Sequence, residues 1–249
     1  MKEFIHIGCP KTASTTLQNS LFARHPEIAS IGKPYESREG EVAKQLYGLI
    51  TKDDFELERC QQALSEEKKR KESTGKVVVL SEEKIYVSPN FEEAGRRLRA
   101  LFPTAKILIT VRNQFDLVTS WYCQGNYDGR YWRWAGIPNP YGNSFVSFDQ
   151  FLDFTFSNSD KNVSEVFHFY KKAMVFADLF GRENVFVLPI EKLKSNPRLF
   201  TRDLSGILGI NNESTFDLLN GKVENQRNTG NISMYRFNSR IAPLKKIPE

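Results

Sequence analysis

The strand, loop and helix at the start of the chain constrain its fold more than any other feature. Residues 4–22, FIHIGCPKTASTTLQNSLF, pass from a short apolar run through Gly8 into a helix with apolar residues at helical spacing. A turn of small hydroxylated residues between a buried strand and a helix N-terminus presents unpaired backbone N–H groups, which bind anions. The sequence therefore predicts a phosphate-type loop at residues 8–13.

Three later apolar runs extend this start into a sheet. Strands are expected at residues 76–80, 106–111 and 184–189, separated by segments with helical periodicity. Strands that alternate with helices indicate βαβ units, so we predict an α/β fold of the P-loop type with three layers, a central parallel sheet flanked by helices. Helices are expected from about residue 114, at 163–180 and at 197–210, and residues 148–156 are expected to have regular structure. The tail after residue 211 is expected to be loop with one short helix.

The composition fits an ordinary globular protein. The 249 residues are 40% hydrophobic and 26% charged, which excludes the disordered and fibrous classes. A net charge of +5 favours anionic ligands but is weaker than the field of a dedicated nucleic-acid binder, so no nucleic-acid partner is expected. We predict a single domain over residues 1–249, with an aromatic-rich excursion at about 124–147.

The cysteines and the apolar runs bear on the compartment. Three cysteines at unpatterned spacing argue against a disulfide framework or a zinc site. No apolar run approaches the length of a membrane span, and the start of the chain has no apolar signal core. These features predict a cytoplasmic protein without stable membrane insertion.

The position of the loop lysine is unusual. Lys11 comes three residues after Gly8 and no second glycine follows, unlike the nucleotide-triphosphate loop G-x-x-x-x-G-K-[ST]. Lys11 offers a point charge, and the loop hydroxyls offer hydrogen bonds to an anion. These hydroxyls belong to Thr12, Ser14, Thr15 and Thr16. The alternative is a well-capped helix with an exposed lysine.

The stretch GCPKTASTTL resembles the 5'-phosphosulfate loop, G-x-P-K-[ST]-G-T-T-x-L, of sulfotransferases that use 3'-phosphoadenosine 5'-phosphosulfate (PAPS). It departs from the family pattern at Ala13, commonly glycine, and at Ser14, commonly threonine. Serine keeps the hydroxyl. Alanine is acceptable if the residue is already helical and needs no positive φ.

A second stretch, ILITVRNQFDLVTSWY, resembles the family pattern R-x-P-x-[DE]-[RVL]-x-x-S, whose arginine and serine hold the 3'-phosphate of the donor. The resemblance assigns these roles to Arg112 and to Ser120, eight residues later. It extends over most of residues 4–210 and is weakest at 124–147. A basic stretch late in the chain folds over the donor in related enzymes, which makes Arg227 a donor contact or a surface residue.

The resemblance implies transfer of a sulfuryl group from PAPS to an acceptor hydroxyl or amine, with 3'-phosphoadenosine 5'-phosphate (PAP) as the product. Lys11 is then the cation at the departing bridge oxygen. No metal is expected, because no convincing acidic residue at a strand end is paired with a loop threonine.

The catalytic base is expected to be a carboxylate. Of the three histidines none falls in the middle segment where many small-molecule members carry their base, and His6 is predicted to be a core residue. The stretch after the second strand loosely resembles the E-K-[ST]-P-x-Y segment of glycosaminoglycan sulfotransferases, which places the base at Glu83, with Glu82 and Lys84 as acceptor contacts. Two alternatives remain: Glu82 is the base, or the pair is exposed and caps the next turn.

The acceptor side is assigned to residues 121–141, which hold all three tryptophans of the chain. Aromatic faces with interleaved arginines suit sugar-like acceptors, so Arg130, Trp132 and Trp134 are predicted acceptor contacts. A carbohydrate or glycolipid is the first choice, with peptide tyrosine and small phenols still open. Alternatively these aromatics pack on the domain or on the second subunit of a homodimer.

Two other functions compete with sulfuryl transfer. One is an ATP-dependent P-loop small-molecule kinase, which would want the longer glycine loop and a metal-binding acid. The other is a catalytically silent nucleotide-binding protein on the same fold, because fold alone does not fix function.

Overall fold

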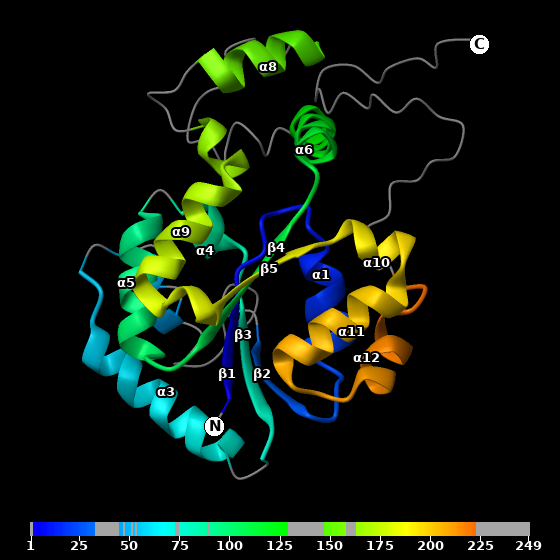
Figure 1. The fold of residues 1–249 in the computed structure, drawn as a ribbon. Helices are drawn as coiled ribbons and strands as arrows, with labels where there is room; N and C mark the ends of the chain where they lie inside the picture. The colour runs from blue at the N-terminus through cyan, green and yellow to red at the C-terminus, as the bar shows by residue number, and fades with distance from the viewer. Residues whose placement is uncertain are drawn as a thin grey trace. The chain divides into compact units, whose positions relative to one another are not determined.

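The computed structural model describes residues 2–32, 45–46, 48–50, 52, 54–72, 75–88, 90–128, 147–157 and 163–222. The chain divides into two compact units, one of residues 1–112 with 169–226 and one of residues 113–168 with 227–249. The first unit contains a five-stranded sheet (Figure 1). Its strands are β1 (Glu3–His6), β2 (Ile28–Gly32), β3 (Val77–Ser81), β4 (Lys106–Val111) and β5 (Val185–Pro189).

Every strand pair is parallel, and the strand order is β2-β3-β1-β4-β5. The inner strands β1 and β3 are buried along their whole length, and the apolar run of β3, VVVLS, is typical of a sheet covered on both faces. Because β1 lies between β3 and β4, the loop that follows β1 opens beside the ends of both neighbours. This is the position where parallel α/β sheets bind their ligands.

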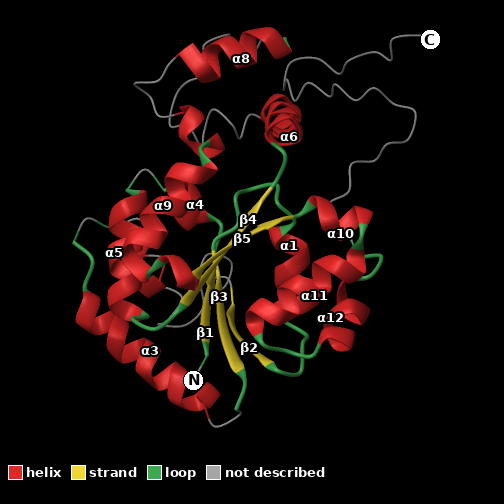
Figure 2. Cartoon of the chain, in the orientation of Figure 1, coloured by secondary structure: helices red, strands yellow, loops and turns green. Residues whose placement is uncertain are grey.

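Helices cover both faces of this sheet (Figures 1 and 2). On one face lie α3 (Leu57–Glu72), α5 (Phe91–Leu101) and α9 (Phe169–Phe180), and on the other α1 (Ser14–Thr16), α11 (Pro197–Leu208) and α12 (Asn212–Leu219). The chain continues from α1 as a π-helix, Leu17–Phe22. The predicted α/β fold, with a parallel sheet between two helical layers, is confirmed.

On the face covered by α1, α11 and α12, alternate side chains of the strands form an apolar cluster with the helices. Phe4 of β1 and Leu108 of β4 join one buried cluster with Leu21, Phe200 and Leu204 of the covering helices. Burial of each such side chain contributes about 1.5–3 kcal/mol. This packing fixes the helix that follows the loop, and therefore one end of the loop itself.

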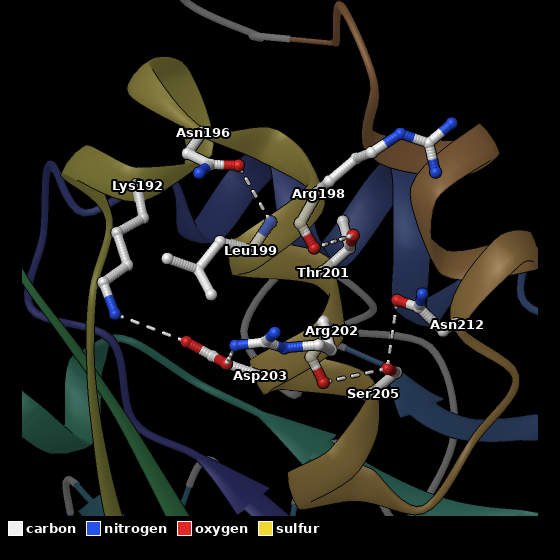
Figure 3. A network of polar contacts seen from close by, with 9 residues as sticks. All are labelled: Lys192, Asn196, Arg198, Leu199, Thr201, Arg202, Asp203, Ser205 and Asn212. Carbon is white, nitrogen blue, oxygen red and sulfur yellow. Dashed lines mark hydrogen bonds and ion pairs between the residues drawn. The ribbon is translucent and has the colours of Figure 1, made fainter.

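Polar contacts hold α11 against its two neighbours, α12 and the short helix α10 (Glu191–Ser195) (Figure 3). The Asn196 side chain accepts the Leu199 N–H at 3.1 Å and caps α11, in which proline occupies the first position. The Lys192 ammonium lies 3.3 Å from the Asp203 carboxylate, and the Ser205 hydroxyl donates to the Asn212 side chain at 3.3 Å. The network explains the local order of this segment without a functional role.

The second unit, described by itself, contains α6 (Gln114–Asp128), α8 (Phe148–Ser157) and a 3₁₀ helix, Val163–Phe167. Trp121 packs edge-on against Phe167, with ring centroids 6.1 Å apart, and is 4% exposed. Tyr122 is also buried and packs against Phe148 and Phe151. The first two aromatic residues of the 121–141 segment are therefore packing residues, as the alternative interpretation of that segment expects.

The structure differs from these predictions in two missed elements and two helix boundaries. The edge strand β2 and the helix α10 were not predicted. The helix expected at 163–180 is divided, because His168 separates the 3₁₀ helix from α9. The helix expected from about residue 114 runs to Asp128, so the start of the 124–147 excursion is helical, and residues 129–146 lie outside the described residues. The single-domain boundary stays a prediction.

Within the described ranges, no helix has both the length and the apolar character needed to cross a membrane.

Candidate functional site

The loop after β1 begins with a tight turn over Cys9, Pro10, Lys11 and Thr12. The Thr12 N–H donates to the Cys9 carbonyl at 3.2 Å, and Lys11 has a φ of 75°. Proline at the second position and positive φ at the third define a type II turn, in which glycine is the preferred third residue. Lys11 therefore occupies a backbone conformation that disfavours a side chain, and the fold must hold it there.

Ala13 has the same conformational problem. Its φ of 58° and ψ of 20° are left-handed, and it precedes the first residue of α1. The condition under which alanine would be acceptable, a residue already helical and without positive φ, is therefore not met. The helix begins one residue later, and the left-handed conformation costs an alanine about 1–2 kcal/mol. Non-glycine residues held in such conformations cluster at ligand sites.

Gly8 and Ser14 define the inside of the loop. A Cβ at Gly8 would collide with the Ser14 hydroxyl and lie 2.8 Å from Thr110 Oγ1, so close approach explains the glycine. Ser14 is 2% exposed, and within the described residues its hydroxyl has no hydrogen-bond partner. A buried hydroxyl without a partner is costly. An anion oxygen in the loop is the kind of partner that it lacks.

The other loop hydroxyls differ in their burial and in their contacts. Thr12 Oγ1 donates to the Cys9 carbonyl at 2.5 Å and lies 2.8 Å from Thr110 Oγ1, so it faces the base of the loop. Thr16 is fully buried and Thr15 is half-buried. The geometry gives Thr12 a supporting position, and Ser14 and Thr15 are the loop hydroxyls that suit a ligand.

Arg112 follows the last residue of β4 and reaches the same loop. Its guanidinium donates one hydrogen bond to the Lys11 carbonyl at 3.4 Å. The structure therefore places Arg112, from the second sequence pattern, in contact with the loop of the first pattern. Ser120 lies half-buried on α6, in the second unit. Arg130, Trp132, Trp134 and Arg227 lie outside the described residues.

Two carboxylates follow β3, the strand beside β1. The Glu82 N–H donates to the His6 carbonyl at 3.1 Å, and Glu82 is 4% exposed. Its carboxylate accepts the Lys84 N–H at 2.9 Å and so caps the short helix α4 (Lys84–Val87). The description of an exposed pair is therefore wrong for Glu82, although its carboxylate does bond the first N–H of α4. Glu83 is half-buried and directly precedes α4.

The Glu83 carboxylate acts electrostatically on the buried thiol of Cys9 in the loop. Burial raises the pKa of Cys9 well above its usual range, and the Glu83 carboxylate raises it further. The Lys172 ammonium and a hydrogen bond from the Tyr86 side chain lower the pKa of this thiol. Cys9 is fully buried within the loop.

Lys172 was not among the predicted residues. It lies on α9, is 6% exposed, and donates to the Tyr86 carbonyl at 2.8 Å. Its ammonium also lies 4.1 Å from the Phe91 ring centroid and 4.9 Å from that of Tyr86. The sequence carried a signal, because Lys172 shares helical spacing with the buried Phe176 and Phe180 of the same helix.

His6 is a core residue, as predicted. It is fully buried, with Nδ1 lying 2.7 Å from Ser81 Oγ and Nε2 lying 3.1 Å from Thr110 Oγ1. Burial lowers its pKa from 6.5 to about 3, so the imidazole is neutral at physiological pH.

Comparison with known proteins identifies the family. A sequence model described as the sulfotransferase family matches residues 4–214. The chain belongs to the sulfotransferase family. No match was found among curated proteins.

Solved sulfotransferases have a similar fold. One is the sulfotransferase from Alicyclobacillus acidocaldarius, with a TM-score of 0.55 and 19% identity over 86% of this chain and 83% of that one. Another is the sulfotransferase domain from the curacin biosynthetic pathway, with a TM-score of 0.53 and 16% identity over 87% and 77% of the two chains. At these identities the likeness concerns the fold.

Metal ligands are the last feature of this site. Among the described residues no group of three or more His, Cys, Asp or Glu side chains is placed to hold a metal ion. Metal-free transfer stays a prediction.

Proposed function

We propose that this sulfotransferase moves a sulfuryl group from PAPS to a hydroxyl or amine of an acceptor by in-line, metal-free transfer, leaving PAP. The loop after β1 carries the proposal. It combines the unpartnered buried hydroxyl of Ser14 with the cation of Lys11. The guanidinium of Arg112 reaches the same turn.

On the donor side, the loop would hold the 5'-phosphosulfate. Ser14 and Thr15 would donate to its oxygens, while Thr12 supports the loop through the Cys9 carbonyl and Thr110. Thr16 is the further proposed donor contact in the loop. Lys11 would neutralise the charge that develops on the departing bridge oxygen, where a positioned cation is most effective. Arg112 uses one of its five donors on the Lys11 carbonyl, and the others suit the 3'-phosphate. Ser120 and Arg227 are the further proposed donor contacts.

On the acceptor side, Glu83 would take the proton from the attacking group. It is half-buried and close enough to Cys9 to affect the pKa of that thiol, which brings it to the loop. Glu82 is the weaker candidate, because one carboxylate oxygen already accepts the Lys84 N–H. Lys172 would act as a positioning residue, since it holds the Tyr86 carbonyl one turn after Glu83.

The proposed acceptor is a carbohydrate or a glycolipid. The support is the loose resemblance around Glu83 to glycosaminoglycan sulfotransferases and the aromatic and basic side chains of residues 130–134. Arg130, Trp132 and Trp134 are the proposed contacts, together with Glu82 and Lys84. A homodimer in which these aromatics meet a second subunit is the competing use of the segment.

A matched pair of variants tests the proposal. Purified protein is incubated with PAPS and a panel of oligosaccharides, glycolipids, tyrosine peptides and phenols, and both PAP and sulfated product are measured. Turnover should fall by about 10²–10⁴ in Glu83→Gln, the range for a lost general base, with PAP affinity retained. Glu82→Gln is the control and should lose less.

Three outcomes contradict parts of the proposal. Loss confined to Glu82→Gln would move the base back by one residue. Phosphoryl transfer from ATP would indicate the kinase, and PAP binding without turnover on any acceptor would indicate a silent nucleotide-binding protein.

A further inference from the structure

A chain of buried hydrogen bonds reaches the loop from below. At its loop end, Thr12 Oγ1 donates to the Cys9 carbonyl, because a carbonyl only accepts. Thr12 has one hydroxyl proton, so the 2.8 Å contact with Thr110 Oγ1 requires that the Thr110 hydroxyl donates to Thr12. Thr110 lies on β4, and its carbonyl also accepts the Cys9 N–H at 3.3 Å.

The His6 ring is at the centre of this row of hydrogen bonds. The proton of Thr110 is used on Thr12, so the 3.1 Å contact with His6 requires that His6 Nε2 carries the proton and donates. The imidazole is neutral, so Nδ1 has a lone pair and accepts from the Ser81 hydroxyl at 2.7 Å. Gln18 Nε2 then donates to Ser81 Oγ at 2.8 Å. The bonds therefore run in one direction from Gln18 to Cys9, without conflict.

These residues occupy the ends of three adjacent strands. His6 is the last residue of β1 and Ser81 the last of β3, and the two are paired in register. Thr110 is the second-last residue of β4. These hydrogen bonds therefore connect the carboxyl ends of the strands to the turn in which Lys11 has positive φ.

We propose that His6, protonated on Nε2, is a positioning residue that holds the Cys9–Thr12 turn in its ligand-binding form through Thr110. The strained turn needs such support, because neither Lys11 nor Ala13 has the conformational freedom of glycine. Glycine at position 8 is consistent with this role of His6, since a Cβ there would crowd both Thr110 Oγ1 and His6 Cε1. The identity of the ligand rests on the proposed function, whereas the hydrogen-bond direction does not.

The tautomer is tested directly on the wild-type protein. Long-range proton–nitrogen NMR correlations of the histidine rings should show His6 protonated on Nε2 alone, with no titration between pH 5 and pH 9. A proton on Nδ1, or a charged ring within that range, would overturn the hydrogen-bond direction. This readout does not depend on PAPS.

The positioning role is tested with three substitutions of buried threonines. Thr110→Val removes the hydroxyl but keeps the shape, and Thr110→Ser keeps the hydroxyl. Thr201→Val is the matched control, because Thr201 is also fully buried and, among the described residues, its hydroxyl bonds only the Arg198 carbonyl, within α11. Amide hydrogen exchange at Thr12 is measured in each, with thermal unfolding as the check that the fold is kept.

The expected result separates loop positioning from general stability. Thr12 exchange should be about tenfold faster or more in Thr110→Val, equivalent to about 1.4 kcal/mol in the opening equilibrium. Exchange should stay near wild type in Thr110→Ser and Thr201→Val. Equal acceleration in Thr110→Val and Thr201→Val, or none, would overturn the positioning role.

PAP affinity gives a second, functional readout. It should weaken in Thr110→Val and recover in Thr110→Ser, and unchanged affinity in Thr110→Val would contradict control of the binding form. If wild-type protein binds no PAP, the proposed function fails, while the tautomer and exchange results still decide the positioning role.

Discussion

The loops after β1 and β3 leave the same edge of the sheet but are held in place differently. The first, residues 8–13, is fixed from beneath by side chains at the ends of its own and adjacent strands, with His6 at the centre. The second, from Glu82 through α4, is held by Lys172 of α9, far along the chain. Each loop therefore has supports of its own, but the two also meet, because the Glu82 N–H donates to the His6 carbonyl and the Tyr86 side chain bonds the Cys9 thiol. We expect damage to one loop to fall mainly on the step proposed for it.

The largest effect is expected from Lys11→Met, which removes the cation of the first loop but keeps a long flexible side chain. Turnover should fall by about 10²–10³, the range for loss of one preorganised electrostatic group. The midpoint of thermal unfolding should change little, because the turn is held by Thr12 and Thr110. Steady-state kinetics and scanning fluorimetry measure the two quantities. Wild-type turnover would remove Lys11 from the reaction.

Lys172→Met tests the second loop. The substitution removes the donor to the Tyr86 carbonyl and releases α4, so turnover should fall roughly 10- to 100-fold, as misplaced groups do. PAP affinity, measured by calorimetry, should stay within a few-fold of wild type. Lys171→Met, at an exposed neighbouring position on the same helix, is the control. A parallel loss of PAP affinity would show that the two loops are not independent.

A smaller effect is expected from pH, acting through His6. Because burial lowers its pKa from 6.5 to about 3, the unfolded chain binds a proton there below pH 6.5 that the folded chain does not. Stability from this group is therefore complete above pH 6.5 and is lost as the pH falls toward 3, by about 1.4 kcal/mol per unit.

Urea unfolding of wild type and His6→Gln at pH 7 and pH 5 measures this contribution. Wild type should lose about 2 kcal/mol more than the variant between these two values. Identical losses would mean that His6 is not buried as a neutral ring.

The smallest effect is expected from Ala13→Gly. Glycine removes the cost of the left-handed conformation but loses more entropy on folding, so a gain in unfolding free energy of up to about 1 kcal/mol is expected. Ala177→Gly, inside α9, should instead destabilise by about 1 kcal/mol. Denaturant midpoints measure both, and a loss in Ala13→Gly would contradict the left-handed assignment.

The same comparison explains what the sequence could predict. The first loop is local: its glycine, lysine and hydroxyls follow a buried strand, and their spacing is enough to predict an anion site. The turn before Ala13 is held by Thr110, which lies about a hundred residues away in the sequence, so a local pattern could not show the support that the loop receives. The role of Lys172 is recognisable only from its tertiary contacts, although its place on the apolar stripe of α9 was a usable signal.

Other elements were missed for physical reasons as well. The edge strand β2, Ile28–Gly32, contains alanine, serine and glycine, which have weak strand preference, and it is recognisable only by its pairing with β3. The break at His168 is not visible in the apolar spacing on either side of it.

The central claim is that the loop after β1 and Arg112 together bind a nucleotide with a 5'-phosphate and a 3'-phosphate. Titration calorimetry of wild-type protein with PAP and with ATP, both without Mg²⁺, tests it most directly. PAP should bind clearly more tightly than ATP, and Arg112→Met should reduce that preference. Tighter binding of ATP would contradict the account, because it would show that the 3'-phosphate is not recognised.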